Sequence, residues 1–270
     1  MEFAINFSPQ AAQLYADRKI HVDRFKCPDW PDMIEEARAL APVYVHFPLD
    51  AGTISGRATD LDAVDAMARD TNTPFVNYHL VAYARDFPDA PPETEDERVT
   101  ALVEERTVSE LSRAVERFGV DRVILENIPY FAPAGKYMRA SVDPDVLRRS
   151  IAQTGCGLLL DLSHARIAAH YLGVDPRAYV ERLPVEHLRE LHLTGVDWVK
   201  GKLLDHMELA DEDLAWTQWA VDRIAAGDWP TPAIVAFEYG GIGEPFKWRS
   251  EAHVIERDVN RLNEMLENAR

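Results

Sequence analysis

The chain has 270 residues, of which 47% are hydrophobic and 28% charged, a composition typical of a globular protein with a sizeable core. Its formal net charge of −17 opposes general attraction to nucleic acid or to anionic lipid. The sequence has no apolar run of about 20 residues, no signal-peptide pattern and no CxxC pair, so we expect a cytoplasmic protein without membrane association or a disulfide framework.

Short apolar segments alternate with helical patterns along the whole chain. Helix starts are indicated by Pro31-Asp32 and by Asp143-Pro144. Apolar strands separated by helices indicate a parallel sheet that is buried on both faces. Eight such units without a break in composition predict an α/β protein, a single (β/α)8 TIM barrel that forms one domain over residues 1–270, with a doubly wound open sheet as the alternative. The predicted strands are residues 3–7, 20–25, 43–47, 75–79, 123–126, 157–161, 188–192 and 234–238.

Residues that bind metals follow these strands in a regular way. Six consecutive predicted strands, the third to the eighth, have a histidine, aspartate or glutamate as their last or next-to-last residue: His46, His79, Glu126, Asp161, His192 and Glu238. His164 follows Asp161 by three residues, and His206 lies in the loop after the seventh strand. In a barrel all carboxyl ends of the strands face one mouth, so these side chains are expected to converge there. Imidazole and carboxylate ligands predict two or more divalent ions of zinc, manganese or iron.

The motifs resemble the xylose-isomerase-like superfamily, and most closely its endonuclease IV branch of apurinic-site nucleases. VHFPL and VNYHL resemble the first two histidine motifs, LENIP the bridging glutamate, DLSHA the Asp-x-x-His pair, and LHLTG and FEYG the later histidine and glutamate. The order of motifs covers the whole barrel, but the likeness is specific only around the strand ends.

The resemblance implies three metal sites. His46, His79 and Glu126 would bind one ion, and the same glutamate would share a second ion with Asp161, His192 and Glu238. His164 and His206 would belong to a third site. The sequence departs from the pattern there, because Leu204 stands where the family has aspartate and Asp205 is out of phase. We therefore favour a two-metal centre.

Two other branches of the superfamily share this barrel. The ketose epimerases and isomerases need only Glu126, Asp161, His192 and Glu238 around one metal, and the histidine at the position of His164 contacts their substrate. The multinuclear non-haem iron oxidases that modify peptides have a similar ligand set. The DLSHA segment fits this last branch less well, since asparagines usually follow its aspartate.

Basic and aromatic residues follow several predicted strands and predict a small anionic substrate, phosphorylated or carboxylated. The candidates for substrate binding are Lys26, Lys136, Arg139, Trp198, Lys200, Lys247 and Arg249. Duplex DNA is disfavoured by the segment 82–98, a predicted lid or surface loop that contains Asp86, Asp89, Glu93, Glu95, Asp96 and Glu97. Cys27 is expected to be a partly buried structural cysteine rather than a reactive thiol.

The leading functional hypothesis is metal-dependent hydrolysis of a phosphoester or related anionic bond, because His46 and His79 exceed what a one-metal epimerase needs. The catalytic residues would be Glu126 between the metals, His164 in proton transfer and Glu238. The alternatives are isomerisation or epimerisation of a sugar or sugar phosphate, oxidation by a multinuclear iron enzyme, and metal-dependent binding without catalysis.

Overall fold

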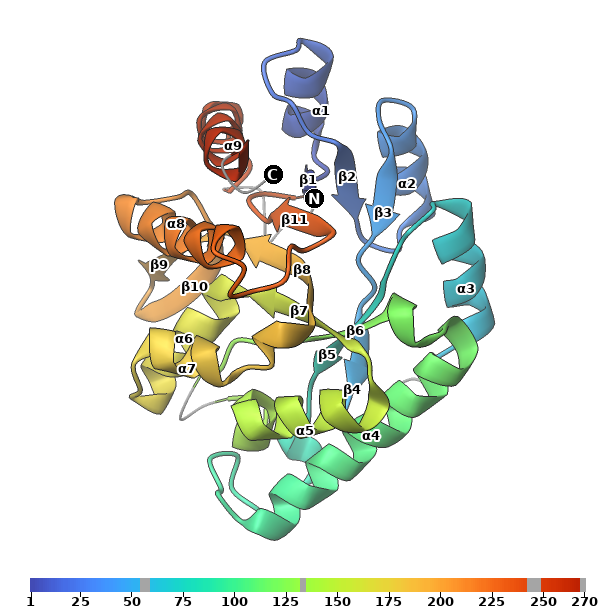
Figure 1. Ribbon diagram of the computed structural model, residues 1–270, viewed down its shortest axis with the longest axis vertical. Helices are drawn as coiled ribbons and strands as arrows, with labels where there is room; N and C mark the ends of the chain where they lie inside the picture. Colours follow the sequence, from blue (N-terminus) through green and yellow to red (C-terminus); the bar gives the residue numbers. More distant parts are fainter. Residues whose placement is uncertain (54–58, 132–134, 242–248, 268–270) are drawn as a thin grey trace. The chain divides into compact units, whose positions relative to one another are not determined.

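The computed structural model describes residues 1–53, 59–131, 135–241 and 249–267. Contacts within the chain divide it into two compact units. Unit 1 comprises Met1–His46, Thr71–Thr73 and Arg189–Arg270, and unit 2 comprises Phe47–Asp70 and Pro74–Leu188. Both units alternate parallel strands with helices along the chain (Figure 1). Within the described part of the chain, no helix has the length and apolar character that crossing a bilayer requires.

Unit 1 contains five neighbouring parallel strands in the order β3-β2-β1-β11-β8. Its core includes Ala4 and Ala236, which pair across β1 and β11, together with Tyr44 and Ile234. The strands are β1 (Glu2–Asn6), β2 (Arg24–Cys27), β3 (Val43–Val45), β8 (Leu188–Leu193, in unit 1 from its second residue) and β11 (Ile234–Phe237), and the helices are α1 (Pro9–Ala16), α2 (Pro31–Arg38), α8 (Asp211–Ala225) and α9 (Ala252–Glu267).

Unit 1 also contains an antiparallel hairpin that we did not predict. It consists of β9 (Gly195–Val199) and β10 (Lys202–Met207), and its register shifts between Leu204 and Met207. The turn passes through Lys200 and Gly201, both with positive φ. GVDWV is only five residues long, and three of the six residues of KLLDHM are polar or charged, so the sequence resembled a loop.

Unit 2 contains four neighbouring parallel strands in the order β4-β5-β6-β7. The strands are β4 (Leu49–Ala51), β5 (Val76–Leu80), β6 (Val123–Glu126) and β7 (Gly157–Asp161), the helices are α3 (Leu61–Asp70), α4 (Glu97–Phe118), α5 (Pro144–Thr154), α6 (Leu162–Leu172) and α7 (Pro176–Arg182), and the 3-10 turns are η1 (Ala84–Asp86), η2 (Val120–Arg122), η3 (Arg139–Val142) and η4 (Val185–His187).

Local sequence signals explain where the helices of unit 2 begin and end. Asp143 caps α5 by accepting a hydrogen bond from the amide of Asp145, and Pro144 occupies the first turn, where its missing N–H costs nothing. Gly155 ends the helix in the left-handed conformation. The expected helix starts at Pro31 and Pro144 are both present.

All eight predicted strands are present, with two differences. The second begins at Arg24 rather than at residue 20, because Ile20 and Val22 are buried in the preceding loop and not in the sheet. The short strand β4 was missed, because three residues of mixed polarity carry no periodic signal. It pairs with β5, and the side chain of Asn77 in β5 exchanges two hydrogen bonds with the backbone of Phe47 just before β4.

Residues 82–98, the predicted lid or surface loop, are anchored in unit 2. The amide of Met138 donates to the carbonyl of Ala82, the amide of Ala84 to that of Lys136, and the amide of Arg139 to that of Pro92. Backbone hydrogen bonds therefore fix this segment against residues 136–139.

We expect Gly195→Ala to destabilise the hairpin that carries His206. A Cβ at residue 195 would collide with the backbone carbonyl of Glu208, so the free energy of unfolding should fall by about 2 kcal/mol or more. Gly201→Ala is the matched control in the same hairpin, because nothing lies within 4 Å of a Cβ there and only its positive φ costs about 1 kcal/mol. Urea denaturation measures both, and equal losses would contradict the prediction.

Candidate metal centre

Unit 2 gathers four potential metal ligands at the carboxyl ends of neighbouring strands. Glu126 ends β6, Asp161 ends β7, and His79 lies in β5 in register with Glu126. Nε2 of His79 lies 3.2 Å from Oε2 of Glu126, and Nδ1 of His164 lies 3.4 Å from Oε1 of the same carboxylate. Parallel strands end at one edge of a sheet, which is why residues far apart in the sequence meet here.

The donor set of unit 2 suits a divalent cation. Glu126, Asp161 and His164 are all buried, and each offers one ligand atom such that these atoms lie within 4.8 Å of one another. A buried carboxylate is costly unless cations or hydrogen-bond donors compensate its charge. Two carboxylates and imidazole nitrogens form the mixed oxygen and nitrogen set that zinc, manganese and iron accept.

Backbone groups orient both imidazoles of unit 2. Nδ1 of His79 lies 3.0 Å from the carbonyl oxygen of Leu49, so donation from Nδ1 leaves Nε2 as the nitrogen that faces Glu126. Nδ1 of His164 lies 2.9 Å from the carbonyl oxygen of Asn127. Such outer contacts set the orientation of ligating histidines.

Asn127 and Asp161 fix each other. The side chain of Asn127 donates to the carbonyl of Asp161 and accepts from its amide, both at 2.9 Å. Oδ1 of Asp161 in turn accepts from the amides of Ser163 and His164 and caps α6. One carboxylate oxygen therefore holds the helix that positions His164, and Oδ2 lies 3.7 Å from that ring.

The carboxylate of Glu126 changes the protonation of His79. Burial by itself lowers the pKa of His79, but the charge of Glu126 and the hydrogen bond to it raise the pKa above its usual value, with smaller contributions from Leu49 and Asp50. A metal ion at Nε2 would compete with this proton.

Unit 1 contains a second donor set. His192 in β8 is fully buried, and its Nδ1 lies 3.1 Å from Oε1 of Glu238, which directly follows β11. Nε2 of His192 lies 2.8 Å from Oε1 of Glu190, and the hydroxyl of Tyr44 donates to that same oxygen at 2.9 Å. A carboxylate behind a histidine raises the basicity of the ring and fixes its orientation toward a metal.

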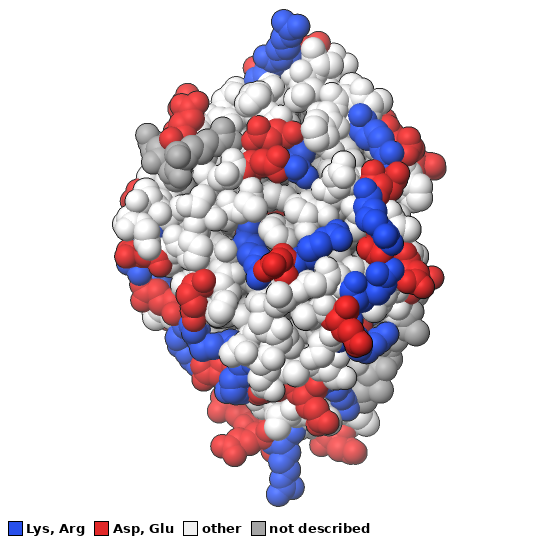
Figure 2. All heavy atoms as spheres, turned by 45° about the vertical axis from the view of Figure 1, so that its right-hand side comes forward, with Lys and Arg blue, Asp and Glu red and all other residues white. Residues whose placement is uncertain are grey.

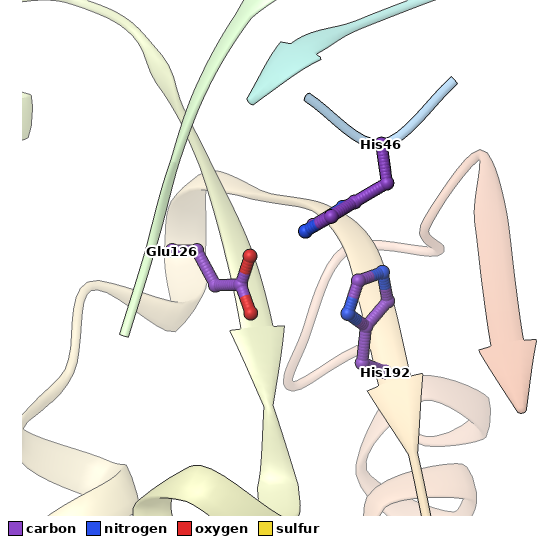
Figure 3. A group of neighbouring side chains, drawn as sticks. All are labelled: His46, Glu126 and His192. Atoms are coloured by element: carbon purple, nitrogen blue, oxygen red, sulfur yellow. The ribbon is translucent and has the colours of Figure 1, made fainter. Parts of the chain in front are cut away.

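His46 and His206 flank this second set in unit 1. Figure 3 shows the rings of His46 and His192 side by side, with centroids 5.3 Å apart, and also draws Glu126 of unit 2. Nδ1 of His206 lies 2.6 Å from the carbonyl oxygen of Glu238, and Nε2 lies 3.8 Å from Oε2 of the same residue. The expected ligands of unit 1 therefore surround Glu238 and His192.

The third metal site predicted by the family pattern gains no support in the hairpin. The register shift in β10 gives His206 a φ of 58°, a strained backbone for a residue other than glycine, and turns its ring toward Glu238. The carbonyl of Asp205 accepts a hydrogen bond from Arg249 at 2.8 Å. Among the described residues, His206 belongs to no group of three close donors.

Lys26 differs most from its expected position. We predicted it in a loop at the substrate, but it lies in β2 and is buried, with its ammonium paired to Oε1 of Glu238. This ion pair joins a predicted substrate residue to a predicted metal ligand. No pattern in the sequence could link residues 212 positions apart.

The other predicted substrate residues lie in the loops and the hairpin. Lys136 is exposed, Arg139 forms an ion pair with Glu95 at 3.1 Å, and Arg249 is partly buried, which lowers the pKa of its guanidinium. Trp198 is 54% exposed in β9 near the exposed Lys200. Lys247 lies outside the described residues. Figure 2 shows basic and acidic side chains interspersed on the face that it draws.

Sequence reasoning missed the residues that support the ligands. Glu190 precedes His192 by two residues, so RELH places both on one face of the strand. This spacing could have predicted the contact between them. No sequence pattern indicated Tyr44 or Asn127, because their roles depend on contacts with distant strands. Asp50, which accepts from the hydroxyl of Tyr83 at 2.9 Å, lies in the unpredicted β4.

A family model described as RiPP precursor modification enzyme MbnB/TglH/ChrH matches residues 25–227. A UPF0276 protein of Caulobacter vibrioides is 30% identical over 131 residues, which cover 47% of this chain and 44% of that protein. One of Paraburkholderia phytofirmans is 30% identical over 139 residues, 48% of this chain and 42% of that protein. The matched stretch thus spans less than half the length of these curated relatives.

Solved structures of similar fold include a D-tagatose 3-epimerase-like protein, with a TM-score of 0.60 at 16% identity over 100% of this chain and 97% of that one. The D-psicose 3-epimerase of Clostridium cellulolyticum H10 has a TM-score of 0.59 at 12% identity, with 100% of both chains covered. A xylose isomerase-like TIM barrel/4-hydroxyphenylpyruvate dioxygenase fusion protein has a TM-score of 0.56 at 14% identity, over 100% of this chain and 43% of that one.

These matches confirm the α/β TIM-barrel class and the xylose-isomerase-like superfamily. Within the superfamily, the match is to enzymes that modify peptides, the branch that the DLSHA segment had made less favoured than endonuclease IV. That residues 1–270 form a single domain stays a prediction, as do the roles of the individual site residues.

We expect Glu190→Gln to weaken binding of Mn²⁺ roughly 10–100-fold, because the amide cannot replace the carboxylate that orients His192. Tyr44→Phe should give a smaller loss in the same direction, since it removes one hydrogen bond to Glu190. Competition with a chelating dye measures the affinity. The control is Glu208→Gln, an exposed glutamate of the same unit that pairs with Arg257. Equal affinities in Glu190→Gln and the control would exclude the orienting role.

Cys27 should not react in the native protein. It is fully buried, and burial raises the pKa of its thiol to about 12, so the thiolate is scarce at pH 8. We expect slow labelling by a disulfide reagent at pH 8 and fast labelling of two thiols after unfolding. A native thiol that reacts within seconds would refute this.

Burial of the neutral thiol also stabilises the fold. Its contribution to the free energy of unfolding is fully present below the ordinary thiol pKa of about 8.5 and is lost as the pH rises toward 12.

Proposed function

The chain belongs to the MbnB/TglH/ChrH family of RiPP precursor modification enzymes, and from that premise we propose that it is a metal-dependent enzyme that modifies a precursor peptide. The observation that carries the proposal is the burial of imidazoles and carboxylates in contact at the carboxyl ends of the strands. The clearest case is Glu126, with His79 and His164 within 3.4 Å of its oxygens.

The residues present fit a multinuclear metal centre. His79, Glu126, Asp161 and His164 would hold metal in unit 2, and His46, His192 and Glu238 in unit 1, with His206 beside Glu238. When bound, such ions polarise a substrate group, and iron also exchanges electrons with it. Iron is our preferred metal, because the peptide-modifying branch that the sequence resembles consists of non-haem iron oxidases.

The histidine side chains differ in how far they are exposed to solvent. The side chain of His192 is fully buried, so it can hold a metal but cannot contact a substrate. The side chains of His79 and His206 are 20% and 22% exposed. Each ring faces a backbone carbonyl through Nδ1, which leaves Nε2 as the nitrogen that would bind a metal on the more exposed side of the ring.

The charges of the predicted substrate residues favour a peptide over a phosphoester. Lys26 is paired with Glu238, Arg139 with Glu95, and Arg249 donates to the carbonyl of Asp205. Three of the expected cations are therefore engaged within the protein. The exposed Trp198 beside Lys200 offers an apolar and basic contact of the kind that a peptide side chain and its backbone accept.

Phosphoester hydrolysis and sugar isomerisation stay as competing predictions. Hydrolysis was favoured by the number of ligands, and isomerisation agrees with the fold of the epimerases, but a shared fold does not establish activity. A small anionic substrate, which the loop charges predicted, would be consistent with either.

We expect protein loaded anaerobically with Fe²⁺ to change the mass of at least one member of a panel of precursor peptides, with consumption of oxygen. Glu126→Gln should reduce this rate at least 100-fold, because the amide removes the charge that His79 and His164 face. Glu116→Gln, an exposed residue of α4, is the control. Mass spectrometry and an oxygen electrode provide the readouts.

The competing functions predict other outcomes of the same assays. Release of phosphate from a phosphoester panel would support hydrolysis, and uptake of solvent deuterium at a sugar carbon would support isomerisation. Metal-loaded protein that leaves every peptide unchanged while performing either reaction would contradict the proposed function.

A further inference from the structure

Lys26 is a buried cation within the donor set of unit 1. Its side chain is 5% exposed, and that of its partner Glu238 is 6% exposed. The residue lies at the carboxyl end of β2, and β1 separates β2 from β11 in the sheet. A buried lysine retains its charge only when a counter-charge compensates the loss of hydration, and Glu238 supplies that charge.

The oxygen that Lys26 contacts is also the one that faces the buried histidine. Oε1 of Glu238 accepts from the ammonium and lies 3.1 Å from Nδ1 of His192. The other oxygen, Oε2, lies 3.8 Å from Nε2 of His206. A cation held by His192 and Oε1 would therefore stand next to a positively charged ammonium.

Unit 2 differs in this respect. Glu126 lies between two imidazoles there, at 3.2 Å and 3.4 Å. An imidazole nitrogen can turn a lone pair to a metal ion and become its ligand, whereas an ammonium has three N–H donors and no lone pair. The ammonium of Lys26 therefore occupies Oε1 of Glu238 as a cation that an incoming ion must share or displace.

We propose that Lys26 is a fixed cation that takes the place of part of a metal ion's charge beside Glu238, and so weakens the binding of an ion at Glu238 and His192. The inference rests on the proposed function in one respect, that the donor sets bind divalent metal. It adds that one lysine sets how firmly the ion at Glu238 and His192 is held. Lys26 is in this sense a positioning residue, and not a contact of the substrate.

The test compares metal binding in charge variants of the full chain. Lys26→Met removes the charge at similar length, Lys26→Gln removes it but retains a donor for Glu238, and Lys26→Arg retains it. Lys19→Met is the control, because it removes the same charge from an exposed lysine of unit 1 that pairs with Glu256. Metal-free protein is titrated with Mn²⁺ against a chelating dye, and elemental analysis after dialysis counts the retained ions.

The proposal predicts that Lys26→Met and Lys26→Gln bind their weakest Mn²⁺ at least tenfold tighter than the wild type, and retain more ions after dialysis. Lys26→Arg and Lys19→Met should match the wild type or bind more weakly. Unchanged or weaker binding in both neutral variants would overturn the proposal. If the neutral variants unfold without metal, Mn²⁺ should restore their fold, because the ion replaces the lost cation, and failure to do so also overturns it.

The same titration separates this proposal from the proposed function. Wild-type protein that binds Mn²⁺ normally, with no tightening in the neutral variants, contradicts the role of Lys26 alone. Wild-type protein and neutral variants that bind no ion contradict both. A wild type without bound metal whose neutral variants do bind it would support the role of Lys26 as the group that blocks the site.

Discussion

Glu126, Asp161 and Glu238 each carry a carboxylate at the end of an apolar strand, where almost no water reaches it. The free energy of burying such a charge is large, so the protein must surround each carboxylate with donors or cations. In unit 2 the backbone amides of α6 and the rings of His79 and His164 do this, and in unit 1 Lys26 and His192 do. The rest of the candidate centre follows from this requirement, because a site that attracts positive charge also suits a metal ion.

The candidate ligands are oriented by hydrogen bonds to groups on the other side of each ring. The carbonyls of Leu49, Asn127 and Glu238 fix the rings of His79, His164 and His206, and Glu190 with Tyr44 fixes His192. Strands and helix ends supply these groups, so the rings are set by the fold itself. The strained backbone of His206 lies in the one ligand segment that belongs to a hairpin rather than to a parallel strand.

Membership of a peptide-modifying family and the geometry of the site bear on different parts of the function. The proposed peptide substrate rests on the family, and the proposed metal chemistry rests on the donor sets. Lys26 and Arg139 pair with carboxylates of the protein, and Arg249 donates to the backbone carbonyl of Asp205. A count of basic residues near strand ends does not give the positive charge available to a ligand, because a sequence does not show which charges are already paired.

The sequence by itself determined the alternation of strands and helices and pointed to the candidate ligand residues, because both are local. Apolar runs such as VILE and GLLLD are strands for lack of any polar periodicity, and their last residue must face the edge where parallel strands end. Only the tertiary structure decided the placement of β4, the hairpin of β9 and β10, and the partners of each ligand. These depend on contacts between residues far apart in the chain. Lys26 illustrates the difference, since its burial against Glu238 results from the order of strands in the sheet, which no local pattern encodes.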